Sequence, residues 1–244
     1  MTIAVLPTDF QIYSSLRQFL LDNLPSDTPV VRGQANRVPE PKKGNFVVLT
    51  EIAKERLETN IDSYADTAFT ASIAVAGTLT VTNVFYGTIS LGSLIFGVGV
   101  PANTIVTGTV GGTGGVGTYQ VSSGTAILGA RTMACGVLNM LQPVEVTVQV
   151  DVHGPNSGDN VHLISTMLRD EYATTAFKRY GPDVTPLYAD DPKQVPFIND
   201  SKQYEDRWIL MACLQANQAV LNIPQQFFDT VLVGLIEVDS HYPA

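Results

Sequence analysis

The stretch Pro143–Gly154 reads PVEVTVQVDVHG, and it alternates apolar and polar side chains over ten consecutive residues. A strict period of two is typical of a β-strand with one buried face and one solvated face. The polar set, which ends with Asp151 and His153, is therefore expected to face solvent. The buried set consists of Val144, Val146, Val148, Val150 and Val152. A sheet that buries this valine face needs a covering layer, which the flanking sequence supplies.

Two amphipathic helices are predicted, one before and one after this strand. Thr8 and Gln11 form a capping-box pattern, and apolar residues then recur at helical spacing until Pro25. A second helix is expected over residues 161–180, with Ser157 or Asp159 as its cap and Gly181-Pro182 as its end.

Further strands are predicted on both sides of the chain's centre. FVVLTEI from Phe46 is a strand, and the run from Arg56 to Tyr64 is its expected partner. RWILMACLQANQAVLN from Arg207 fits either a helix or a strand. A strand is favoured because Pro224 and the run TVLVGLIEVD, residues 230–239, suggest a second β segment paired with it. These elements predict an α+β fold with a central mixed or antiparallel sheet and two flanking helices.

A change of composition interrupts this α+β pattern. Residues 68–134 contain 13 of the 20 glycines and a single charged residue, Arg131, among short Thr/Val-rich runs. We expect a small all-β inserted domain at 66–135, with the core domain split into 1–65 and 136–244. A domain of this size buries only a modest hydrophobic core, which suggests that the insert packs against its host domain or against neighbouring proteins. Low-complexity disorder is the alternative.

The insert also contains a G-x-G-x-x-G pattern at Gly112, Gly114 and Gly117. A dinucleotide-binding loop needs a helix directly after these glycines, because the helix N-terminus holds the pyrophosphate. The residues that follow, Thr118 to Ser122, are strand-like instead. The glycines are therefore predicted to lie in a β-hairpin turn.

Bulk properties exclude several function classes. The formal charge of −9 argues against a general nucleic-acid-binding protein, which would carry an excess of Lys and Arg. Cys135 and Cys213 have no CxxC spacing, and the N-terminus lacks a basic segment followed by a long apolar run. We expect synthesis in a reducing cytoplasm and no membrane span.

Candidate catalytic and metal-binding residues are few. Asp151, His153, Asp159 and His162 lie within twelve residues and suggest a metal site, although a regular strand and a helix cap also explain them. The adjacent Asp190 and Asp191 fit a solvated loop better than a carboxylate pair. No G-x-S-x-G, H-E-x-x-H or P-loop motif occurs. We therefore predict no enzyme activity, no metal and no cofactor.

Two kinds of residue are candidates for contacts with partners. The segment VVRGQANRVPEPKKGN predicts a long positive loop that faces either solvent, an acidic partner surface or a DNA backbone. Its basic residues are Arg32, Arg37, Lys42 and Lys43. Trp208 is predicted to be a core residue or an interface anchor.

Several stretches, taken in order, resemble one protein family. They are VRGQANRVPEPKKGNFVVLTEI, RLETNIDSY, EVTVQVDVHGPNSGDN, LRDEYA, QYEDRWILMACLQANQAV and IPQQFFDTVLVGLIEVD. Over residues 1–65 and about 136–244 the chain resembles the neck or tail-terminator proteins of tailed bacteriophages. The insert is similar to Gly/Thr/Val modules of phage structural proteins, with runs such as GTLTVT and GVGVPANTIVTG.

This resemblance implies a virion protein of the neck or tail with a tail-terminator-like fold and no enzyme activity. It implies a homohexameric ring, with genomic DNA passing through the lumen without sequence-specific binding. The implied partners are the tail tube protein, the head-tail connector or adaptor protein, and the sheath protein if the tail is contractile.

Two other classes of function stay open from the sequence. A carbohydrate-binding or adhesive decoration protein would act through exposed aromatic residues of the insert. The candidates are Phe69, Phe85, Tyr86, Phe96 and Tyr119. A small hydrolase would instead use the cluster between Asp151 and His162.

Overall fold

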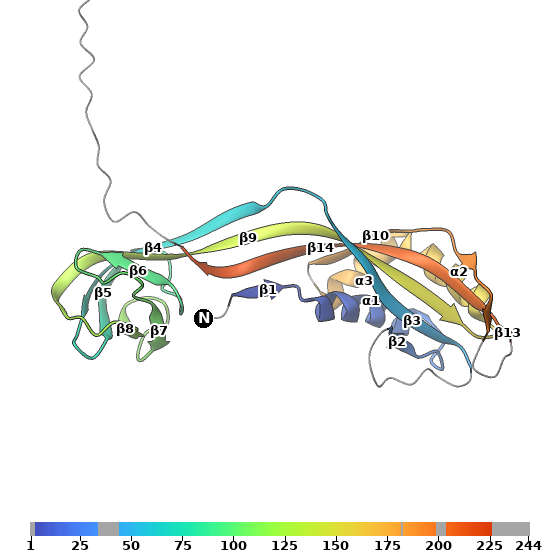
Figure 1. Cartoon of the computed structure of the whole chain (residues 1–244), viewed down its shortest axis with the longest axis horizontal. Helices are drawn as coiled ribbons and strands as arrows, with labels where there is room; N and C mark the ends of the chain where they lie inside the picture. The colour runs from blue at the N-terminus through green and yellow to red at the C-terminus, as the bar shows by residue number, and fades with distance from the viewer. Residues whose placement is uncertain (1–2, 34–43, 182, 199–203, 226–244) are drawn as a thin grey trace, which may run out of the picture. The chain divides into compact units, whose positions relative to one another are not determined.

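The computed structural model describes residues 3–33, 44–181, 183–198 and 204–225. These residues form an α+β fold with a largely antiparallel sheet, and the chain divides into two compact units (Figure 1). The helical unit comprises Ala4–Asp62 and Met140–Leu221, and the barrel unit comprises Ser63–Asn139 with Ile3 and residues 222–225 of the described chain. No helix among the described residues is long and apolar enough to span a membrane.

The helical unit contains all three helices that the structure describes. Its elements are β1 (Ala4–Leu6), α1 (Asp9–Asn23), β2 (Val30–Arg32), β3 (Phe46–Arg56), α2 (Ser157–Leu168), α3 (Glu171–Tyr180), β10 (Val184–Ala189), β11 (Lys193–Gln194), β12 (Phe197–Ile198) and β13 (Tyr204–Glu205). Three longer strands have residues in both units, namely β4 (Ile61–Ile73), β9 (Ile127–His153) and β14 (Arg207–Pro224).

The valine stretch lies in β9, and its five valines are buried in the core of the helical unit. β3 pairs antiparallel with β9 over Phe46–Arg56, β2 pairs parallel with β3, and β14 lies beside β9. The sheet is therefore mixed, as predicted. The three helices supply the other half of the core, which includes Leu16, Phe19, Ile164 and Phe177.

The first helix forms where the sequence predicts it. Thr8 caps α1, and both hydrogen bonds of the capping box with Gln11 are present. The residues at helical spacing, Ile12, Leu16, Phe19 and Leu20, are buried. The prediction of a strand from Arg207 is also confirmed, because β14 pairs along its length with β1, β10 and β11. The run 230–239 lies outside the described residues.

The single helix predicted over residues 161–180 is wrong, because two helices occupy this region. α2 ends at Leu168, and Asp170 caps α3 by accepting a hydrogen bond of 2.8 Å from the Tyr172 amide. A side chain that satisfies a free helix amide starts a new helix at this point. The N-cap of α2 is Asn156, which makes no side-chain capping bond, so neither Ser157 nor Asp159 has the predicted role.

The predicted pairing of residues 56–64 with the strand from Phe46 is also wrong. Residues 57–60 contain no Gly or Pro to turn the chain back, and β4 lies beside β9 and β5 rather than beside β3. The physical reason is that a hairpin needs a tight turn, which Leu-Glu-Thr-Asn does not favour.

The barrel unit contains β5 (Thr78–Tyr86), β6 (Leu94–Gly97), β7 (Val106–Thr109) and β8 (Gly117–Val121) together with parts of β4 and β9. Neighbouring strands follow the order β9-β4-β5-β8-β7, and β6 pairs with β9. A bridge between Leu94 and Ile105 links β6 to the chain before β7. The pairings therefore close into a small barrel, which leaves few open strand edges.

The core of the barrel explains the glycine-rich loop. The Tyr119 side chain is fully buried, accepts a 2.9 Å hydrogen bond from the Gly114 amide and donates one of 2.7 Å to the Gly115 carbonyl. A Cβ at Gly112 would lie 2.3 Å from the Tyr119 ring. The loop is folded onto its own tyrosine, and a strand follows it, so it lacks the helix that a dinucleotide site requires.

We predict that Gly112→Ala destabilises the barrel unit by about 1–3 kcal/mol, because the new methyl group overlaps the buried Tyr119 ring. Gly115→Ala is the matched control, since a Cβ there meets no atom within 4 Å, and its effect is expected to stay within about 0.5 kcal/mol. Urea unfolding followed by circular dichroism measures both variants. Equal midpoints would contradict the proposed packing.

Candidate functional site

The cluster suggested as a metal site is a buried ion pair instead. Arg207 donates to one Asp151 oxygen through Nε and Nη2, at 3.0 and 2.6 Å, and Gln149 donates to the other at 2.7 Å. Asp151 is 4% exposed, so the prediction that it faces solvent is wrong. The guanidinium from the neighbouring strand covers this part of the sheet face and compensates the carboxylate charge.

His153 is also buried rather than solvent-facing. Its ring stacks on Phe46 with centroids 4.4 Å apart, and its Nδ1 lies 3.3 Å from a Glu205 oxygen. Asp159 and His162, in contrast, are exposed on α2. No three acidic, His or Cys side chains among the described residues are arranged to hold a metal ion.

The two cysteines are buried thiols. Burial raises the pKa of Cys135 to about 11, and it raises the pKa of Cys213 as well. Both groups therefore stay protonated near neutral pH. Since the thiolate is the nucleophile, neither side chain is poised for catalysis.

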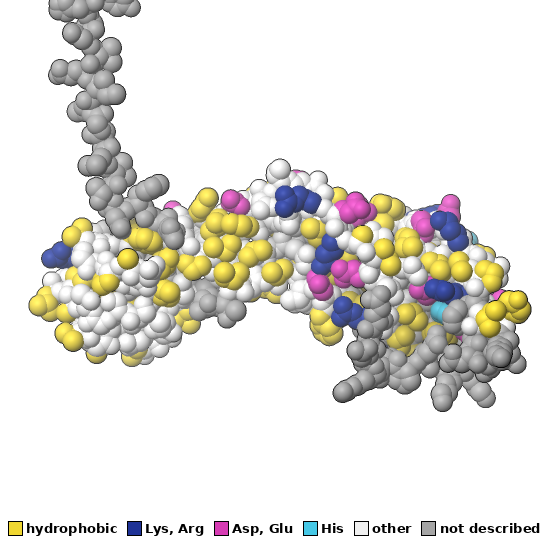
Figure 2. Space-filling view, viewed as in Figure 1, with side chains coloured by type: hydrophobic (Ala, Val, Ile, Leu, Met, Phe, Trp, Pro, Cys, Tyr) yellow, Lys and Arg dark blue, Asp and Glu magenta, His cyan; other side chains and the backbone are white. Residues whose placement is uncertain are grey.

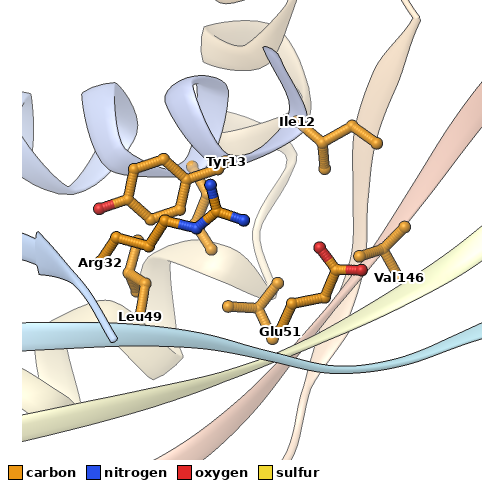
Figure 3. Close-up of a pocket in the computed structure, with 8 residues that line it drawn as sticks. Ile12, Tyr13, Arg32, Leu49, Glu51 and Val146 are labelled. Atoms are coloured by element: carbon orange, nitrogen blue, oxygen red, sulfur yellow. The ribbon is translucent and has the colours of Figure 1, made fainter. Parts of the chain in front are cut away.

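Arg32 is the one residue of the predicted basic set that the structure describes. It ends β2, is exposed, and holds its guanidinium carbon 5.4 Å from the centre of the Tyr13 ring. Figure 3 shows the two side chains next to each other. The pocket beside it, which Glu51 also lines, has a volume of about 20 Å³, enough for a water molecule but not for a ligand. Arg37, Lys42 and Lys43 lie outside the described residues.

A neighbouring basic residue is neutralised within the helical unit. The Lys54 ammonium bonds to Asp9 in the first turn of α1 and lies 3.7 Å from a Glu51 oxygen. The hydrogen bond from Lys54 lowers the pKa of Asp9 below its usual value. Arg32 therefore remains the more available positive charge on this side of the sheet.

Trp208 is partly buried and packs against the core of the helical unit. A Cβ at Gly158 would lie 3.5 Å from its indole nitrogen, which places the ring beside the first turn of α2. The structure therefore gives Trp208 an internal packing role.

The barrel unit has an almost uncharged surface. Asp66 and Arg131 are its only Asp, Glu, Lys or Arg residues between positions 63 and 139, and Figure 2 shows charged side chains concentrated over the helical unit. Of its five aromatic candidates, Phe69 and Tyr119 are fully buried and Phe96 is half-buried. Phe85 and Tyr86 are exposed.

Sequence reasoning missed a groove in the helical unit. It has a volume of about 310 Å³ and is lined by Leu6, Pro7, Gln11, Ser15, Tyr180, Gly181, Asp183 and Val184. The groove lies where the edge along β14 is interrupted, because β1 pairs with Ala219–Leu221 and β10 pairs with Ala212–Ala216. No sequence signal shows that residues 6–7 and 183–184 meet, because only their shared neighbour β14 brings them together.

We predict that Asp151→Asn lowers the free energy of unfolding of the helical unit by about 3 kcal/mol, because it leaves the Arg207 charge partly buried without its carboxylate. Asp191→Asn is the control. Its carboxylate pairs with Arg169 but is 88% exposed, so less than about 1 kcal/mol is expected. Urea unfolding followed by the fluorescence of the single tryptophan, Trp208, measures both. A small loss for Asp151→Asn would show that the pair contributes little.

Comparison with known proteins gives the family. The profile of the phage neck terminator proteins matches residues 116–239, half of the chain, and this span includes β8, β9, the helices α2 and α3, and β14. A comparison with curated proteins finds no match. The matched family is a family of structural proteins, not of enzymes. The chain belongs to the phage neck terminator protein family and is therefore a structural protein of the virion neck.

Proposed function

We propose that the protein forms a homohexameric ring that terminates the tail tube and joins it to the head connector. The family match over residues 116–239 is the observation that carries this proposal. The partners would be the tail tube protein, the head-tail connector or adaptor protein and, in a contractile tail, the sheath protein. Electron microscopy of assembled particles tests it, since a protein found only on fibres, or absent from the neck, would overturn it.

The charge of the chain supports a lumen that DNA crosses without binding. A ring of copies that each carry a net charge of −9 repels phosphates and so lets the duplex slide. A local basic segment can still dock on an acidic neighbouring protein. Arg32 and the basic residues that follow it, Arg37, Lys42 and Lys43, are the proposed contacts with a partner or with the DNA path.

We predict that replacing Arg32, Arg37, Lys42 and Lys43 together by Ser leaves the fold intact but reduces particle assembly or DNA retention. Arg32 makes a cation–π contact with Tyr13 worth only about 0.5–1 kcal/mol at an exposed site, so the helical unit is expected to fold. The double replacement of the exposed Lys178 and Arg179 by Ser serves as a charge control. Particles that assemble and retain DNA like the parent would show that the segment is only a solvated surface.

The barrel unit is proposed to be an outward-facing β module that ring closure does not require. Its strands bury a core of their own, centred on Phe69, Leu79 and Tyr119. A solvated module normally carries more charge, so its Thr- and Ser-rich surface is proposed to rest on a neighbouring protein. Such hydroxyls form hydrogen bonds without the desolvation cost of ions.

We predict that replacing residues 67–135 by a short Gly-Ser linker yields a chain that still folds and still enters rings. The reason is that the helical unit retains its own core of β9 valines and helices. Circular dichroism checks folding, and electron microscopy of particles checks ring entry. Loss of ring entry by a folded chain would show that the barrel belongs to the subunit interface.

A further inference from the structure

The sheet of the helical unit has two incomplete edges. On one side, β2 pairs with β3 only at Val47–Leu49, and no strand among the described residues pairs with that edge beyond this point. On the other side lies the groove between β1 and β10. An incomplete sheet edge is a place where another chain can attach.

The two incomplete edges lie at the same height along the strands. The Leu57 amide bonds to the Pro143 carbonyl of β9, at the end of the open stretch of β3. Thr147 of β9 contacts Cys213 of β14, and Arg207 contacts Asp151, so these two strands run antiparallel. Pro143 therefore lies level with residue 217 of β14, whose amide bonds to the Asp183 carbonyl at the groove. Opposite edges at equal height allow a head-to-tail contact between copies, and such contacts form a ring when the rotation between copies closes.

The chemistry of the two edges is complementary. Leu57 is an exposed apolar side chain with Arg56 before it. Arg56 forms no ion pair among the described residues, and its guanidinium donates hydrogen bonds to the neutral side-chain oxygen of Gln142. The groove has apolar walls at Leu6, Pro7 and Val184, and its single acidic lining residue, Asp183, likewise has no ion-pair partner in the described chain. Its volume of about 310 Å³ accommodates a leucine side chain with part of its backbone.

We propose that Leu57 of one copy inserts into the groove beside Leu6 of the next copy, with Arg56 paired to Asp183 across the contact. The contact is heterologous, because each copy offers Leu57 on one edge and the groove on the other. This inference rests on the proposed ring and names the surfaces that would close it. All of its residues belong to the helical unit.

Disulfide trapping in assembled particles tests the contact. The full chain with Leu57→Cys and Leu6→Cys, whose native thiols are buried, is assembled, oxidised and separated without reductant. We expect a ladder of covalent multimers, because each copy is joined to the next. Each single variant alone should give none, and a mixture of the two single variants should stop at dimers. Leu57→Cys with His162→Cys, an exposed position on α2, is the control pair and should give no ladder.

Charge reversal gives a second readout that needs no cysteine. Arg56→Glu and Asp183→Arg should each weaken ring formation about tenfold or more, and the double variant should recover it. Absence of the ladder in particles that contain the ring, or no effect of either reversal, would overturn the contact while leaving the ring itself in place. Absence of the parent protein from the neck would instead overturn the proposed function.

Discussion

Burial of the valine face of β9 is the constraint on which the helical unit depends. The five valines occupy one side of the strand, and the apolar faces of α1, α2 and α3 form the core with them. Because side chains alternate along a strand, a shift of one residue would exchange valines for Glu, Thr, Gln, Asp and His. This fixes the register of β9 against β3 and β14, and through them the positions of β1, β2 and β10.

The barrel unit differs from the helical unit in composition and in how its strand edges are protected. In other proteins, charged side chains on edge strands discourage unwanted pairing with other chains. The barrel unit has almost no charged residues that could do this. Closure of the pairings through β6 and the Leu94–Ile105 bridge removes most of those edges instead. The glycine-rich loop then covers the end of Tyr119, and Gly112 is needed because the ring lies where a side chain would be.

In the helical unit, some charged groups near the sheet are paired within the unit itself. Asp151 pairs with Arg207 and Lys54 with Asp9. Arg56 and Asp183 have no ion-pair partner among the described residues, and each lies at an incomplete edge of the sheet. For a neck protein that assembles with others, such groups are the natural candidates for contacts between chains.

The sequence by itself determined the α+β class, the capped first helix, the buried valine face and the strand nature of residues 207–222, because each depends on local periodicity or a local hydrogen bond. It also led to the family. It did not determine that α2 and α3 are separate helices, since Asp170 fits the interior of one long helix as well as the N-cap of a new one. Only the tertiary structure decided that Asp151 and His153 are buried, because Arg207 and Phe46 come from strands distant in sequence. The groove between Pro7 and Val184 likewise exists only because both segments flank β14.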